Sequence, residues 1–65
     1  MSNGKRKKIL IVDDEKNFTF MIKLNLEITG KYQVKEENKS TQALASTLAY
    51  RPDLLILDFY MPVWK

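Results

Sequence analysis

The sequence predicts an open α/β sheet built in the order strand, helix, strand, helix, strand. Residues 9–12 (ILIV) and 54–57 (LLIL) are continuous apolar runs, a pattern typical of parallel strands that are covered on both faces. Parallel neighbours require crossover connections, which are usually helical and right-handed. A third strand is predicted in the segment YQVKEEN, residues 32–38, where Tyr32 and Val34 alternate with polar residues as in a half-exposed edge strand.

The first crossover, residues 18–30, carries two conflicting patterns. Apolar residues at every second position indicate a strand, whereas Phe18, Met21 and Ile22 have helical spacing. A run of about a dozen residues that ends at Gly30 has the usual length of a helix, and the crossover requires one. We therefore predict a helix. Its surplus apolar residues would face solvent or a partner: Phe20, Leu24 and Leu26.

The second crossover has a simpler pattern. Its helix is predicted to begin at Ser40, which suits an N-cap, and to end before Pro52. Leu44 and Leu48 lie one turn apart. The small residues expected to allow close approach to the sheet are Ala45 and Ala49.

Composition excludes several kinds of chemistry. The sequence of 65 residues contains no Cys and no His, so it offers no disulfide, no thiolate ligand and no imidazole base. Any site must use carboxylates, hydroxyls, lysines or backbone groups. Its longest apolar runs are too short for a membrane span or a signal peptide, and we expect a soluble, cytoplasmic chain.

The net charge of +3 comes largely from the segment KRKK at residues 5–8. A basic arm that binds nucleic acid is one interpretation of this segment. A solvated tail is the favoured one, because no basic or aromatic stripe follows it. We therefore predict a basic flexible tail over residues 1–6, a partial domain over residues 7–65, and no binding of nucleic acid or membrane.

Acidic residues follow both apolar runs. Asp13, Asp14 and Glu15 come after the first, and Asp58 comes after the third strand. Carboxyl ends of neighbouring parallel strands meet at one edge of a sheet, where function usually resides. Clustered carboxylates need a cation, and oxygen ligands without sulfur or nitrogen favour Mg²⁺. A carboxylate beside such an ion can attack phosphorus and form an aspartyl phosphate.

Each motif also has a purely structural interpretation. The acids at residues 13–15 could stabilise a helix N-terminus, and Asp58 could be a turn residue. Other phosphate chemistry lacks its sequence marks, since neither GxxxxGK[ST] nor GxGxxG occurs. A phosphatase with an aspartate nucleophile would normally carry a second acid two positions later, where this sequence has Tyr60.

The segments ILIVDDE, STQAL and PDLLILDFYMP resemble the first half of a bacterial two-component response-regulator receiver domain, over residues 7–62. The resemblance implies a truncated flavodoxin-like fold with a parallel sheet in the order 2-1-3, without strands four and five. It implies that Asp58 is the phosphoacceptor. The phosphoryl group would come from a sensor histidine kinase, a phosphotransfer protein or a small phosphodonor. Mg²⁺ would be held by Asp13, Asp14, Asp58 and the backbone carbonyl of Tyr60. Such a chain is a signalling module and not an enzyme.

The sequence also departs from the family. It contains no counterpart of the Ser or Thr after strand four or of the Lys after strand five, which bind the phosphoryl group in the family. A phosphorelay receiver fragment and a phosphorylation-incompetent, self-associating half-receiver are therefore both open. The third strand, residues 54–57, would be an apolar edge, so we expect a symmetric or swapped homo-oligomer.

Overall fold

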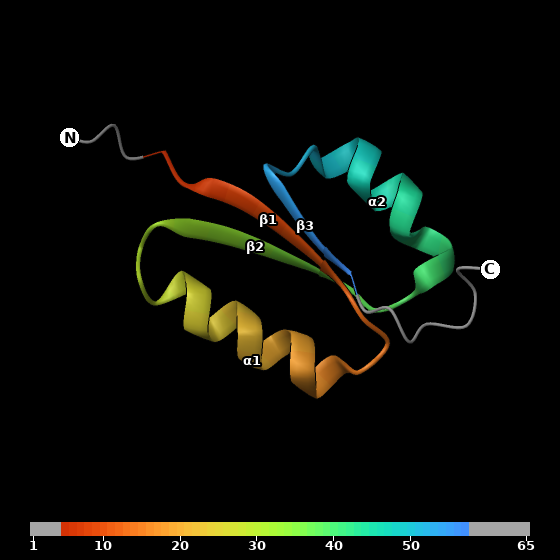
Figure 1. Ribbon diagram of the computed structural model, residues 1–65, viewed down its shortest axis with the longest axis horizontal. Helices are drawn as coiled ribbons and strands as arrows, with labels where there is room; N and C mark the ends of the chain where they lie inside the picture. The colour runs from red at the N-terminus through yellow and green to blue at the C-terminus, as the bar shows by residue number, and fades with distance from the viewer. Residues whose placement is uncertain (1–4, 58–65) are drawn as a thin grey trace.

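Three parallel strands form one sheet, as the sequence predicts, in the order β2-β1-β3 that the family resemblance implies (Figure 1). The computed structural model describes residues 5–57. The strands lie between α1 on one side and α2 on the other (Figure 1). Within the described part of the chain, no helix has the length and apolar character needed to cross a membrane. The elements are β1 (Lys7–Val12), α1 (Lys16–Glu27), β2 (Tyr32–Glu37), the 3₁₀ turn η1 (Ser40–Gln42), α2 (Ala43–Tyr50) and β3 (Leu54–Leu57).

The central strand β1 is buried on both faces, which explains its unbroken apolar run. Ile9 and Ile11 pack with Val34 beneath α1, against Ile22 and Leu26. On the opposite face, Leu10 and Val12 pack with Ala43 from α2. β1 is therefore the element that joins the two halves of the core.

α1 presents to the sheet only part of the face that its apolar spacing predicts, since Ile22 packs against the core. The helix is confirmed, but its buried position is Thr19, which is fully buried, whereas Phe18 and Met21 are exposed. Leu26 packs against the core, so its prediction as a surplus residue was wrong. Phe20 and Leu24 are exposed, as predicted. The hydrogen bonds of Thr19 with residues 36 and 38 account for this buried face.

α2 also differs in its start and in its buried face. Ser40 does not cap the α-helix, because residues 40–42 form η1 and the helix begins at Ala43. Ala43 is the buried residue, whereas Leu44 and Leu48 are exposed, as are the two alanines predicted to approach the sheet, Ala45 and Ala49. The close approach is thus made by another alanine, two positions before the first of the two predicted ones.

The end of α2 agrees with its prediction. Arg51 caps the helix in the left-handed conformation with φ of 54°, and its N–H donates to the carbonyl of Thr47 at 2.9 Å. Pro52 follows and cannot continue a helix. The reversal returns the chain to the start of β3, where the N–H of Asp53 donates to the carbonyl of Lys8 at 2.7 Å.

Candidate functional site

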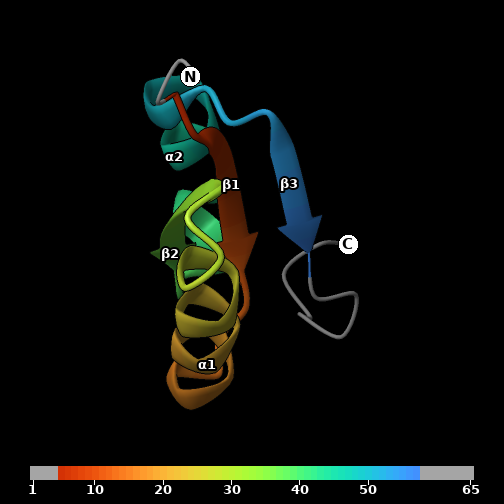
Figure 2. The same cartoon turned by 90° about the vertical axis from the view of Figure 1, so that its left-hand side faces the viewer.

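The carboxyl ends of β1 and β3 lie side by side, as the candidate site requires. Val12 pairs with Leu57 in the parallel register, and each is the last residue of its strand. Figure 2 shows the arrowheads of the two strands at the same end of the sheet. Asp13 comes directly after β1. The predicted site residues Asp58 and Tyr60 lie outside the described residues.

Asp13 is a largely buried carboxylate held in a tight turn. Its side chain is 8% exposed, and its Oδ1 accepts the N–H of Glu15 at 2.9 Å. Its own N–H donates to the carbonyl of Glu37 at 3.1 Å and so extends the β1–β2 ladder by one bond. This turn connects β1 to α1. The next residue, Asp14, is exposed.

Glu15 has the structural role at a helix N-terminus that the sequence allows for the acidic run. It is the N-cap of α1, and its Oε1 accepts the N–H of Asn17 at 3.3 Å. Such capping satisfies one of the N–H groups that a helix start leaves without a partner. The acidic run is therefore divided by role, since Glu15 serves the helix while Asp13 and Asp14 stand at the strand end.

A polar network behind the turn was not predicted from the sequence. The Asn38 side-chain amide donates to the carbonyl of Asp13 at 2.8 Å and to Oγ1 of Thr19 at 3.0 Å. The Thr19 hydroxyl also contacts Oε1 of Glu36 at 2.7 Å. The available signal was the position of Asn38 directly after β2, which matches the position of Asp13 directly after β1.

The described residues fit part of a magnesium site. Asp13 and Asp14 offer only oxygen donors, which Mg²⁺ prefers, and Mg²⁺ commonly takes one or two carboxylates and keeps several waters. Within residues 5–57, no group of three or more acidic, His or Cys side chains could hold a metal ion. A further carboxylate would have to follow β3.

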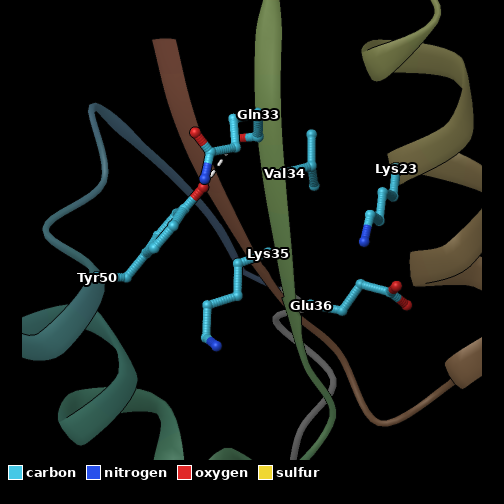
Figure 3. A pocket seen from close by; sticks show the side chains of 6 residues that line it. All are labelled: Lys23, Gln33, Val34, Lys35, Glu36 and Tyr50. Atoms are coloured by element: carbon cyan, nitrogen blue, oxygen red, sulfur yellow. Dashed lines mark hydrogen bonds between the residues drawn. The ribbon is translucent and has the colours of Figure 1, made fainter. Parts of the chain in front are cut away.

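A separate shallow pocket of about 420 Å³ lies over β2 and not at the carboxyl ends (Figure 3). Lys23 of α1 and Tyr50 of α2 approach β2 from opposite sides, and the Tyr50 hydroxyl donates to the carbonyl of Gln33 at 3.0 Å. The remaining lining residues are Val34, Lys35 and Glu36. Its charged side chains, Lys23, Lys35 and Glu36, do not form a recognisable catalytic arrangement.

Comparison with known proteins agrees with this geometry. The family model of the response regulator receiver domain matches residues 9–65. The chain belongs to the response regulator receiver domain family. The family and the sheet order expected from the sequence are thereby confirmed, and receiver membership implies a part in phosphorelay signalling.

Relatives of this receiver chain include two proteins that are named as transcriptional regulatory proteins. The chain is 39% identical over 56 residues to the alkaline phosphatase synthesis transcriptional regulatory protein PhoP of Bacillus subtilis, covering 86% of this chain and 23% of that protein. It is 43% identical over 56 residues to the phosphate regulon transcriptional regulatory protein PhoB of Pseudomonas aeruginosa, covering 86% and 24% respectively.

A further relative has an enzymatic name. The receiver chain is 36% identical over 55 residues to protein-glutamate methylesterase/protein-glutamine glutaminase 3 of Rhodospirillum rubrum, covering 85% of this chain and 15% of that protein. The chain thus spans a quarter or less of the length of these relatives. No solved structure gives a significant match to the chain.

Proposed function

We propose that this receiver chain accepts a phosphoryl group on Asp58 in a phosphorelay. The observation that carries the proposal is the pairing of Val12 with Leu57, because Asp13 and Asp58 follow these two residues in the sequence. Parallel neighbours in register direct the residues that follow them to the same edge of the sheet. A nucleophilic carboxylate and a cation-binding pair would then share one pocket.

The proposed step is a transfer between two protein groups. An Asp58 carboxylate oxygen attacks phosphorus and forms the new O–P bond, while the P–N bond to the donor imidazole breaks and the imidazole leaves with its electron pair. Asp13, Asp14, Asp58 and the Tyr60 carbonyl would hold Mg²⁺, which neutralises charge on the phosphoryl oxygens when bound. The buried, hydrogen-bonded Asp13 would keep its carboxylate in place during the step.

The proposed partners follow from the same chemistry. A sensor histidine kinase or a phosphotransfer protein supplies the phosphohistidine, and the receiver chain itself is the accepting module and not an enzyme. Acetyl phosphate or phosphoramidate can replace the protein donor in the test.

The test is intact mass after incubation with phosphoramidate and Mg²⁺. Wild type gains the mass of one phosphoryl group, and Asp58→Asn gains none. Asp53→Asn is the matched control, because Asp53 is an exposed aspartate at the opposite end of β3. A phosphoryl adduct that persists in Asp58→Asn would refute the assignment of Asp58.

We also propose self-association through the β3 edge, with one specific observation in its favour. β3 pairs only with β1 among the described strands, and its Leu54 and Leu55 are exposed by 53% and 38%. Exposed apolar edge strands are templates for pairing with another chain. The β2 edge is different, because the N–H of Val34 donates to Oε2 of Glu27 from α1 at 2.9 Å.

Light scattering over a range of protein concentrations tests this association. Wild type is expected to exceed the 7.6 kDa mass of one chain, and Leu55→Lys is expected to return to it. Leu44→Lys places the same charge on an exposed leucine of α2 and should leave the assembly intact. A monomeric, folded wild type would end the proposal.

A further inference from the structure

The fully buried hydroxyl of Thr19 occupies the centre of the polar network behind the acidic turn, residues 13–15. Thr19 has no exposed surface, although α1 could have placed an apolar side chain at this position. A buried hydroxyl is costly unless it is hydrogen-bonded. Thr19 meets this requirement through Glu36 and Asn38, both of which come from the carboxyl end of β2 or directly after it.

The hydroxyl fixes the direction of these hydrogen bonds. A hydroxyl has one proton and two lone pairs, and the closest acceptor of the Thr19 proton is Oε1 of Glu36, at 2.7 Å against 3.1 Å for the carbonyl of Lys16. The Thr19 oxygen therefore accepts from Asn38, whose amide nitrogen must face it. With the amide reversed, the Asn38 oxygen would face the carbonyl of Asp13, and two acceptors would be opposed.

Both amide hydrogens of Asn38 are thus used, and one of them holds the backbone of the acidic turn. The N–H of Asp13 donates to the carbonyl of Glu37 at 3.1 Å, and the carbonyl of Asp13 accepts from Asn38 at 2.8 Å. Two consecutive residues, Glu37 at the end of β2 and Asn38 directly after it, therefore bond to the N–H and the carbonyl of Asp13. The peptide plane that joins Asp13 to Asp14 is therefore held through its carbonyl by Asn38, whereas the contact with Glu37 holds the preceding peptide plane.

We propose that Asn38, oriented by Thr19, is a positioning residue for the acidic turn and sets its affinity for a divalent cation. The inference rests on the proposed function for its cation. Asn38 does not need to touch the ion, because it acts through the Asp13 carbonyl and so through the direction in which the Asp14 carboxylate leaves the backbone. Partners that orient ligands in this way typically alter metal affinity by about 10- to 100-fold.

The first test uses amide hydrogen exchange of the full chain without metal. Asn38→Ala is expected to speed exchange at Asp13 and Glu15 by about tenfold, as loss of a hydrogen bond from the turn permits local opening. The amides of Lys7 and Asp53, which bond at the opposite end of the sheet, should keep their rates. Equal acceleration at all four amides would show a general loss of stability and overturn the proposal.

The second test is an Mn²⁺ titration followed by paramagnetic broadening of the Asp14 amide signal. Asn38→Ala and Thr19→Val are expected to weaken binding about tenfold. Thr19→Ser is the matched control, because it keeps the hydroxyl that orients Asn38 and should bind as wild type does. If Thr19→Val fails to fold, Asn38→Ala still gives the comparison, since Asn38 is only partly buried.

The two tests separate this inference from the proposed function. If wild type and Asn38→Ala bind Mn²⁺ equally, the positioning role is wrong while the cation site stands. If wild type shows no response to Mn²⁺, the proposed cation site fails. In that case, selective exchange at Asp13 and Glu15 still supports the hold of Asn38 on the turn, and uniform exchange overturns it.

Discussion

The hydroxyl of Ser46 donates to Oε1 of Glu37 and ties α2 to the carboxyl end of β2. The other carboxylate oxygen of Glu37 accepts the N–H of Lys39 at 3.0 Å. These contacts lower the pKa of Glu37, chiefly through the Ser46 hydrogen bond; the Lys39 N–H and the charges of Lys35 and Lys39 act in the same direction, while partial burial opposes them. These contacts therefore favour the ionised form of Glu37, whose backbone carbonyl is bonded to the acidic turn at Asp13.

Ser46→Ala is expected to raise the pKa of Glu37 toward its ordinary value of 4.5, because the largest stabilising contact of the carboxylate is lost. A carboxyl titration by NMR measures this change. Thr41→Ala removes an exposed hydroxyl nearby in the chain and serves as the control. An unchanged pKa in Ser46→Ala would contradict the assigned cause.

The same pair predicts a pH dependence of folding stability. The folded pKa of Glu37 is lower than the unfolded value, so the unfolded chain binds more protons in acid. The contribution of Glu37 is complete above pH 4.5 and is lost as pH falls through the lowered pKa. The stability difference between wild type and Ser46→Ala should therefore shrink in acid, as urea unfolding at several pH values can measure.

Tyr50 provides a prediction for the alkaline side. Burial raises the pKa of Tyr50, and the carboxylates of Glu27 and Asp53 add to the effect. The folded state binds the phenolic proton more tightly than the unfolded state does. The resulting contribution of Tyr50 to folding stability is complete below pH 10 and is lost as pH rises through the raised pKa. Tyr50→Phe should remove this alkaline loss, and the ultraviolet absorbance titration should lose the transition that belongs to Tyr50.

Tyr50→Phe should also lower the free energy of unfolding near neutral pH by about 0.5–1.5 kcal/mol. The variant loses the hydrogen bond from the hydroxyl to the carbonyl of Gln33, but its ring still packs against the core of Leu10 and Val12. The ring also keeps its contact with the Lys8 ammonium, 4.8 Å from the ring centre. A loss of several kcal/mol would mean that the ring itself had shifted.

Glu27→Ala should speed amide exchange at Val34 and destabilise the sheet by about 1–3 kcal/mol. The Glu27 carboxylate accepts the N–H of Val34, and its removal leaves that part-buried donor without an acceptor. Glu27→Gln retains an acceptor oxygen and should lie close to wild type. Equal exchange rates at Val34 in Glu27→Ala and wild type would show that water satisfies the donor equally well.

The sheet could be predicted from sequence because its signals are local. Continuous apolar runs identified two strands, and alternation identified the edge strand β2, whose Val34 is buried while Gln33 and Lys35 are exposed. The buried face of α1 could not be predicted in this way. Thr19 is buried because of partners 17 and 19 positions away, at Glu36 and Asn38, and apolar spacing within the helix carries no information about them.

The candidate site was predictable to a similar extent. Asp13 and Asp14 were found because acids after buried strands are conspicuous, and the pairing of β1 with β3 is as expected. Asn38 was missed because its role depends on the orientation of one amide, which the buried hydroxyl of Thr19 determines. Sequence therefore indicated which groups could bind a ligand, but not which groups hold them in place.

The central position of β1 between two strands at different distances along the chain also has a kinetic consequence. Contacts between β1 and the end of β2 join positions such as Asp13 and Asn38, 25 residues apart, whereas Lys8 and Asp53 join β1 to the start of β3 across 45. Closing the longer loop costs about 0.5 kcal/mol more in chain entropy, so β1, α1 and β2 should assemble first and β3 should dock last. Leu57→Ala should then speed unfolding and leave the folding rate nearly unchanged in stopped-flow measurements. The carboxyl-end pocket would be completed only in this final step.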